Sequence, residues 1–299
     1  MRIAYFDCFS GISGDMCLGA LIAAGVDFDG LKEELAKLPV DGYALRREKI
    51  KRNGITADNI FVDLLTEEQP ERHLSDIQQI IDGSDLPREA KEKSKAVFGC
   101  LAAAEAAVHD TTLENIHFHE VGAVDAIIDV VGTVMGLYLL GVDKIYASPL
   151  PMGKGFIRCM HGIIPSPAPA TMEILRNVTV YGNGIEGELV TPTGAALIRT
   201  LAEDFIDLPA MKVEKIGYGS GKKAMQHPNL LRLIIGRGCH DHKPGILNHG
   251  HRHEHGHHVH SHVHGHGHVH CHADAASGPV YEHRHEHKHD VEKDTGVNK

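Results

Sequence analysis

The sequence predicts a mixed α/β (α+β) globular domain followed by a histidine-rich tail. First, 42% of the 299 residues are hydrophobic, which is enough for a sizeable core. Second, strand-like and helix-like segments are interspersed along the first 238 residues, with no internal repeat. Third, the composition changes near Gly238, and 19 of the 25 histidines lie in the last 60 residues.

This change in composition places the domain boundary. We expect one α/β domain at residues 1–238 and a tail at 239–299. If the domain consists of two subdomains, we expect the division between them near 110–120. The tail has few large apolar side chains, so it cannot bury enough apolar area to offset the entropy of ordering its chain. We therefore expect the tail to be flexible in the absence of metal.

The first half of the domain shows clear periodic patterns. Residues 2–7 predict a strand. Two alternating segments, 43–51 and 59–65, predict strands joined by a turn at Asn53-Gly54. The Ala-rich segment 87–109 begins with proline, as helices often do. Further helices are expected at 16–24, 28–37 and 74–81.

The second half is punctuated by glycine and proline. We expect a helix at 123–140 and a short strand at 144–148. Residues 149–171 are so rich in Gly and Pro that they predict a long structured loop, and such loops are often functional. Helices at 170–176 and 192–202 and a strand at 230–235 complete the expected elements.

Charge and cysteine usage narrow the class of protein. A formal net charge of −10 argues against a nucleic-acid partner, which normally meets a basic face. Acids at Asp7 and Asp15 interrupt any signal peptide, and no window approaches the ~20 apolar residues of a membrane span. Six cysteines without a CxxC pair fit a reducing cytoplasm. We expect a soluble, cytoplasmic protein with no membrane partner; a homo-oligomer is compatible with the sequence.

The tail predicts binding of a divalent transition metal, with nickel favoured. Neutral imidazole binds nickel, copper and zinc, and alternating His-x-His places several rings within reach of one ion. Affinity alone would favour copper, so the pattern does not identify the metal. A solvated low-complexity linker and a cloning tag are the alternatives. The expected ligands are His251, His253, His255, His257, His258, His260, His262, His264, His266, His268, His270 and His272.

A second group of candidate residues precedes the helix at 123–140. His117 and His119 would lie on one side of a strand, and Glu120 follows them. Asp125 and Asp129 are one helical turn apart. Such a set could hold a metal or move protons, so we assign catalysis to His117, His119, Glu120 and Asp125 and metal binding to the two histidines. The alternative is a pair of structural histidines beside acids that favour the helix start.

The turn between the first strand and helix, FSGISGD, could bring Ser13, Gly14 and Asp15 to an anion at the helix N-terminus. Asp15 and Asp7 could instead hold a cation. The turn is not a Walker motif, because no Gly-Lys-Ser/Thr follows. The alternative is a tight turn in which a serine caps the helix.

Three later segments are also candidates for anion contacts. Lys154 lies between glycines in the 149–171 segment, where His161 is a candidate acid, base or ligand. Thr191 can cap a helix that begins at Pro192, which would expose Thr193 and Gly194 at its positive end; capping alone would also explain the pattern. Lys222 follows what we expect to be a glycine turn at 217–221, a pattern suited to phosphate but not diagnostic of it.

Together these stretches resemble the LarC family of nickel-insertion proteins. The resemblance rests on FDCFSGISGDM, HFHEVGAVDAIIDVVG, PMGKGFIRCMHGIIPSPAPAT, GELVTPTGAA and GYGSGKK, in this order between Asp7 and about Arg237, with the histidine-rich segment after them. Five stretches in register make it specific.

The resemblance implies a function and a set of partners. Family members insert Ni²⁺ into pyridinium-3,5-bisthiocarboxylic acid mononucleotide, forming the nickel-pincer nucleotide used by lactate racemase-type enzymes. The reaction is a lyase-class cyclometallation that consumes CTP. CTP, with Mg²⁺ or Mn²⁺, is expected on a C-terminal companion domain, which would follow the tail and which this chain lacks. The main alternative is a non-enzymatic nickel store or metallochaperone; a phosphate-handling hydrolase ranks last, because no nucleophile–base pair shows a recognisable spacing.

Overall fold

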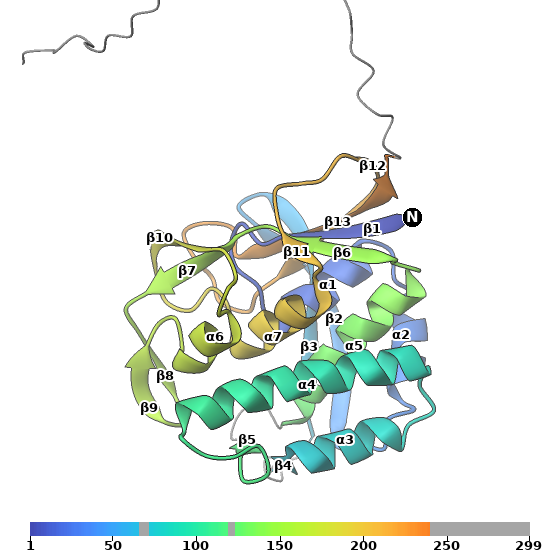
Figure 1. Ribbon diagram of the computed structural model, residues 1–299. Coiled ribbons are helices and arrows are strands. Elements are labelled where there is room, and N and C mark those ends of the chain that lie inside the picture. The colour runs from blue at the N-terminus through green and yellow to red at the C-terminus, as the bar shows by residue number, and fades with distance from the viewer. Residues whose placement is uncertain (66–71, 119–122, 240–299) are drawn as a thin grey trace, which may run out of the picture. The chain divides into compact units, whose positions relative to one another are not determined.

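The computed structural model describes residues 1–65, 72–118 and 123–239, except for the side chain of His117. They belong to one compact unit. The main sheet has seven strands in the order β11-β6-β1-β13-β12-β3-β2, and helices pack beneath it (Figure 1). The expected mixed α/β class is confirmed. The expected boundary at residue 238 and the division near 110–120 stay predictions.

The centre of the sheet is built by strands from both ends of the described chain. β1 (Arg2–Asp7) pairs antiparallel with β13 (Leu230–Gly238) and parallel with β6 (Lys144–Ala147). β11 (Asp204–Phe205) extends the sheet beyond β6. Because β1 is central, the turn that leaves it starts in the middle of the fold.

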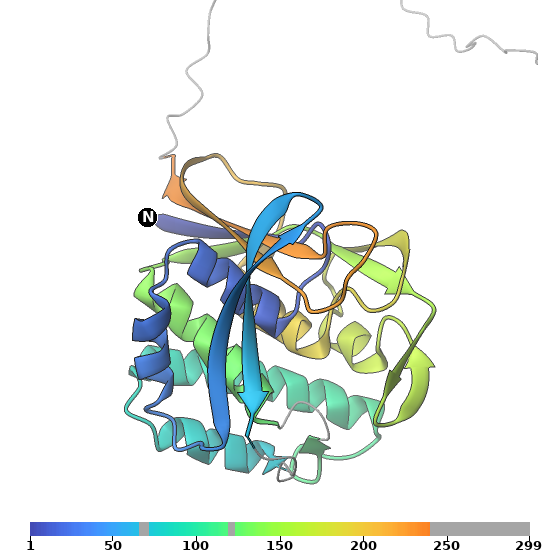
Figure 2. The same cartoon turned by 180° about the vertical axis from the view of Figure 1, so that it is seen from behind.

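The other side of the sheet ends in a long hairpin. β12 (Met211–Ser220) pairs with β13 and meets β3 (Ile55–Leu64), which pairs in turn with β2 (Tyr43–Arg52). The hairpin turns at Asn53 and Gly54, both with positive φ, so the predicted Asn-Gly turn is confirmed. Figure 2 shows this hairpin running down the side of the helices.

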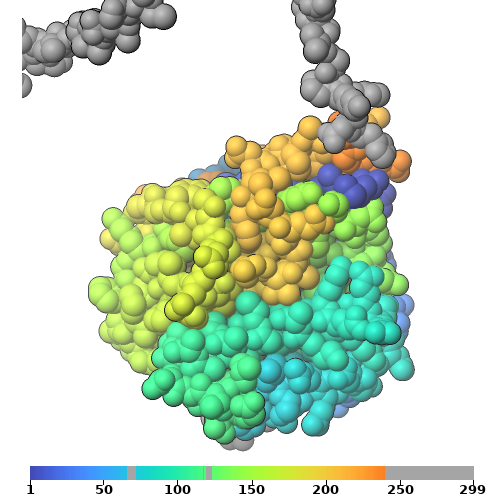
Figure 3. Space-filling model, viewed as in Figure 1, coloured from blue at the N-terminus to red at the C-terminus, as the bar shows by residue number. Residues whose placement is uncertain are grey.

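The helices form layers under one face of the sheet. α1 (Gly14–Ala23) packs on β12, β13 and β3, and α5 (Val124–Leu139) packs on α1. α4 (Arg88–Val108) lies across α5, α6 (Pro169–Ile174) and α7 (Pro192–Leu201). The space-filling view shows α4, α6 and α7 meeting at the surface (Figure 3). α2 (Phe28–Leu35) packs on α5, and α3 (Leu74–Asp82) packs on α4.

Most of these elements agree with the sequence patterns to within a few residues, but two predictions are wrong. The segment 149–171 is not one loop: it holds three strands and the start of α6. Its strands pair with partners that lie far off in the sequence or across a tight turn, so a local pattern could not reveal them. They are β7 (Leu150–Lys154), which pairs with β10 (Val180–Glu186), and the hairpin β8 (Phe156–Cys159) with β9 (Gly162–Pro165).

The expected glycine turn at 217–221 is the second error. Gly217 and Gly219 lie within β12, where a Cβ would come 2.5 Å from the backbone nitrogens of Ala24 and Ala20. The glycines therefore let α1 approach the sheet closely, a known use of glycine in strands. The turn itself begins at Gly221. Two short strands, β4 (Arg72–His73) and β5 (His117–Phe118), pair beside the helices and place His73 opposite His117 in register.

Candidate functional site

The ends of several elements meet around one cavity of about 640 Å³. The C-terminal end of α4 and the N-terminal ends of α1, α5, α6 and α7 contribute to its walls, together with the β8–β9 hairpin and the loop after β12. Figure 1 shows the hairpin beside the C-terminal end of α4. A cavity of this size can hold a drug-sized ligand.

Most described residues predicted from the sequence line this cavity. It brings together residues from five segments of the chain: Ser13, Gly14, Asp15, Asp125, His161, Thr191, Thr193 and Lys222. Gly194 lies behind the wall, where its missing side chain lets α7 pack against the backbone of Ile12 and Ser13. Lys154 is exposed at the end of β7 and is not among the lining residues. The sequence order gave no indication that these segments share one site.

Carboxyl groups form one side of the cavity. Asp15, which is 8% exposed, accepts a hydrogen bond at Oδ1 from the backbone N–H of Met16 (2.9 Å) and another from the Ser13 hydroxyl. Ser13 is the N-cap residue of α1 but does not cap it with its side chain, so the alternative of a serine side chain that caps the helix is wrong. Burial raises the pKa of Asp15, against the opposing effects of the Ser13 hydroxyl and the Lys222 ammonium.

Asp129 lies beside this carboxyl group. Its Oδ1 is buried and has no hydrogen-bond partner within the described part of the chain. Burial, followed by the charges of Asp15 and Asp125, raises its pKa well above the ordinary value, while Lys222 lowers it. Asp125, by contrast, accepts the backbone N–H of Ala126 at 2.9 Å. A buried carboxyl group of perturbed pKa in a cavity is a typical feature of functional sites.

Imidazoles lie on another part of the lining. The rings of His109 and His161 are in contact, with centroids 4.9 Å apart and planes tilted by 43°. His109 Nε2 is 3.5 Å from a carboxylate oxygen of Glu105. Sequence reasoning identified His161 but missed His109 and Glu105, because they end an Ala-rich helix that looked purely structural. These groups can bind or transfer protons and bind metals.

Positive groups complete the lining. Thr191 caps α7 by accepting the backbone N–H of Gly194 at Oγ1 (3.1 Å), and Pro192 follows at the first helical position, so the predicted cap is confirmed. Lys222 and Lys223, on the loop that follows β12, also line the cavity. The loop is tied to the β2–β3 hairpin, because Arg52 donates to the carbonyl oxygens of Gly221 (3.1 Å) and Lys222 (3.3 Å). A helix N-terminus and two ammonium groups suit an anion such as phosphate.

Some predicted residues cannot be placed. The side chain of His117, residues His119 and Glu120, and all the predicted metal ligands of the tail lie outside the described residues. Within residues 1–65, 72–118 and 123–239, no group of three or more His, Cys, Asp or Glu side chains is arranged to hold a metal ion. Asp7, a candidate cation ligand, is bound by the guanidinium of Arg232, with Nε 2.8 Å from Oδ2. Asp7 is therefore part of the sheet and not of the cavity.

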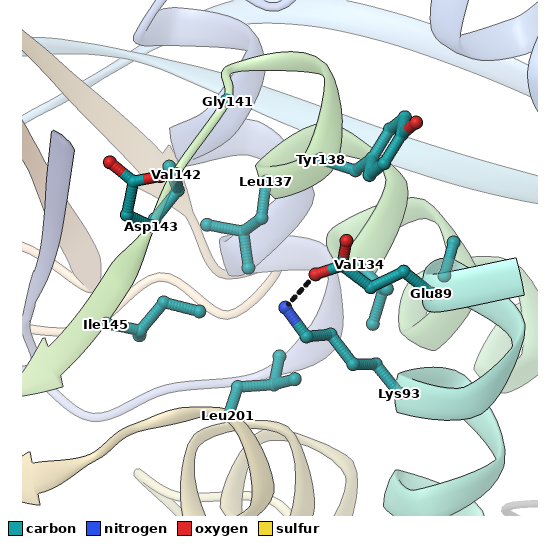
Figure 4. Close-up of a pocket in the computed structure, with 11 residues that line it drawn as sticks. Glu89, Lys93, Val134, Leu137, Tyr138, Gly141, Val142, Asp143, Ile145 and Leu201 are labelled. Carbon is teal, nitrogen blue, oxygen red and sulfur yellow. Dashed lines mark ion pairs between the residues drawn. The ribbon is translucent and has the colours of Figure 1, made fainter. Parts of the chain in front are cut away.

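A second cavity, of about 340 Å³, lies between the N-terminal end of α4 and the C-terminal end of α5 (Figure 4). It is lined mainly by apolar side chains, with the ion pair of Lys93 and Glu89 (2.8 Å) at its edge. None of the residues singled out from the sequence lines it. The 640 Å³ cavity is therefore the candidate functional site.

Comparison with known proteins gives a consistent result. The model of the family described as "Nickel insertion protein" matches residues 4–287. The pyridinium-3,5-bisthiocarboxylic acid mononucleotide nickel insertion protein of Desulfitobacterium hafniense is 52% identical over 236 residues, which cover 79% of this chain and 58% of that protein. A putative nickel insertion protein of Dictyoglomus thermophilum is also 52% identical, over 238 residues, 79% of this chain and 61% of its own length.

The chain thus spans about three-fifths of the length of these curated relatives. No solved structure gave a significant match. In the described part of the chain, no helix is both long and apolar enough to cross a membrane.

Proposed function

Because the chain belongs to the family of nickel insertion proteins, we propose that its cavity binds pyridinium-3,5-bisthiocarboxylic acid mononucleotide and takes part in the insertion of Ni²⁺ into it. The observation that carries this proposal is the convergence of anion-binding groups, carboxyl groups and imidazoles on one cavity. The anion-binding groups would bind the phosphate of the nucleotide. A carboxyl group would act as the base for the ring C–H, and the imidazoles would bind nickel on its way to the ring.

The substrate has two thiocarboxylate groups on a cationic ring and a phosphate on its sugar. We assign the phosphate to the N-terminal end of α7, with Thr191 and Thr193, and to Lys222 and Lys223 across the cavity. The ring would then lie toward the carboxyl groups, which favour its positive charge. Ser13 and Gly14, at the start of α1, belong to the same binding wall.

Nickel is the substrate that must reach this ring. We propose that the tail histidines collect Ni²⁺ and that His117, His119 and Glu120 pass it on, with His161 at the lining of the cavity. In the cavity, the two sulfurs of the precursor would complete the ligands of the ion. This distinguishes insertion from storage.

We further propose that the reaction uses CTP with Mg²⁺ or Mn²⁺ on a companion domain, and that a lactate racemase-type enzyme in the cytoplasm receives the product. The first proposal is supported by the family resemblance and by the length of the relatives, two-fifths of which lies outside the match. The cytoplasmic location is supported by the free cysteines of the described residues.

The test is an insertion assay with the purified full chain, Ni²⁺, CTP and the precursor. It is run with and without the unmatched segment of the Desulfitobacterium relative. We expect precursor binding by the chain itself, and formation of the nickel–carbon product in at least one arm. The double substitution His117→Ala/His119→Ala should reduce the insertion rate. A chain that binds many nickel ions but no precursor would instead be a nickel store, the alternative function.

A further inference from the structure

Five acidic side chains line the cavity, and the three aspartates among them, which belong to α1 and α5, differ in what they contact. Asp15 accepts two hydrogen bonds, from the Ser13 hydroxyl and the Met16 N–H, and Asp125 accepts the N–H of Ala126. Each donated hydrogen bond stabilises the charged form and makes the carboxylate a weaker base. Asp129 differs, because its buried Oδ1 has no donor within the described residues.

The position of Asp129 is also built by the fold. Its carboxyl group lies against Gly14 at the start of α1, where a Cβ would come 2.5 Å from Oδ2 and 2.6 Å from the Asp129 Cβ. Any side chain at position 14 would displace the carboxyl group. Because Gly14 has no side chain, Asp129 fits beside the N-terminal end of α1, where it lines the cavity.

We propose that Asp129 accepts the proton that leaves the pyridinium ring when nickel bonds to the ring carbon, an inference that rests on the proposed function above. Ni²⁺ bonds to the carbon that lies between the two thiocarboxyl groups, and the C–H bond of that carbon breaks. The electron pair of the C–H bond becomes the nickel–carbon bond, and the proton moves to a carboxylate oxygen of Asp129. Nickel stays divalent, so the step consumes no oxidant or reductant.

The surroundings of Asp129 suit both halves of this step. Before proton transfer, three positive charges favour its ionised form: Lys222, the pyridinium ring and the incoming Ni²⁺. After transfer, the nickel charge is offset by the ring carbon and the two sulfurs. Burial then favours the neutral carboxylic acid, in line with the raised pKa of Asp129. Asp129 is thus ionised, and able to accept the proton, when the substrates are present, and it holds the proton once they have reacted.

The first experiment compares wild type with Asp129→Asn, which keeps the shape of the side chain but cannot accept this proton. General-base catalysis contributes about 100-fold to 10,000-fold, and we expect the insertion rate to fall by such a factor. The precursor affinity should stay within about threefold. Thr133→Val is the matched control, because Thr133 is also a buried polar residue of α5 without a hydrogen-bond partner among the described residues, and it does not line the cavity. Its insertion rate should equal that of wild type.

A second variant guards against misfolding. In Asp129→Ala the space of the carboxyl group is empty, and added formate should restore part of the insertion rate, while Thr133→Val should gain nothing from formate. Asp129→Asn with a wild-type rate would overturn the assignment of the base. The assignment would also be overturned if Asp129→Ala folded and bound the precursor but showed no increase in insertion rate with formate. A wild-type chain that bound no precursor in any arm would overturn the proposed function and, with it, this inference.

Discussion

Replacing Gly194 by alanine should damage the site by pushing apart two of its walls. Gly194 is the third residue of α7, and a Cβ there would lie 2.6 Å from the carbonyl carbon of Ile12 and 2.8 Å from the Cα of Ser13. Carbon atoms pack at roughly 3.5 Å, so the new atom is about 0.9 Å too close to Ile12. Both neighbours are backbone atoms, which means that helix and turn must separate.

The size of the effect follows from this displacement. Overpacking of a tightly packed region costs about 1–3 kcal/mol of unfolding free energy. A misplacement of about 1 Å between substrate-positioning groups can cost roughly 100-fold in rate. We therefore expect Gly194→Ala to lower the midpoint of urea unfolding and to reduce the insertion rate by about that factor, because Thr193 moves away from Ser13.

The assay measures urea unfolding, precursor affinity and the initial rate of nickel insertion on the same preparations. Gly99→Ala is the matched control: Gly99 lies inside α4, and a Cβ there meets no atom within 4 Å. Since alanine favours a helix interior over glycine by about 1 kcal/mol, this control should be at least as stable as wild type and fully active. A Gly194→Ala protein with wild-type stability and rate would refute the close contact.

Substitutions at three further positions and one truncation have defined outcomes. The pKa of Asp129 is raised in the folded protein, so the protein loses stability as the pH rises from the ordinary value of 3.8 through the raised pKa. In thermal melts, Asp129→Asn should therefore melt at a higher temperature than wild type at pH 7, and the difference should vanish near pH 4. Thr191→Ala should lose about 1 kcal/mol of unfolding free energy in urea, and Thr191→Ser should lose little, because serine keeps the capping oxygen. Arg52→Ala should raise the KM for the precursor several-fold with little change in kcat, since Arg52 only holds the loop of Lys222, and Arg52→Lys should recover part of the affinity. Removal of residues 239–299 should abolish nickel binding that weakens as pH falls through ~6.5; unchanged binding by the truncated chain in calorimetry would contradict the tail assignment.

The local patterns of the chain were sufficient for most of the helices and for the outer hairpin. Residues 88–108 form a helix because the segment is rich in alanine and places buried residues such as Val97 and Leu101 at helical spacing. The Asn53-Gly54 pair adopts the positive φ angles that its turn requires. The strands within 149–171 could not be predicted in this way. β7 pairs with β10, about 30 residues later, and such pairing leaves no local period in glycine- and proline-rich sequence.

The site shows the same division between local and distant information. Thr191 could be recognised as a cap, because a cap is a property of four consecutive residues. The placement of Asp129 beside Asp15 depends on α5 packing against α1, and nothing in either segment indicates it. His109 was missed for a related reason: only the β8–β9 hairpin, which brings His161 to it, makes the end of α4 part of a site.

The buried carboxyl groups are also the strongest physical reason to regard this cavity as functional. Taking a carboxyl group out of water without a partner costs stability, and an apolar residue would avoid that cost. The fold nevertheless brings Asp129 close to Asp15, leaves Oδ1 of Asp129 without a donor among the described residues, and makes room for the Asp129 carboxyl group with a glycine at position 14. The charge of Lys222 partly offsets the repulsion between the two carboxyl groups, and a cationic substrate would offset it further. Such an arrangement weakens the empty protein, and the cationic ring and divalent ion of the proposed reaction would relieve it.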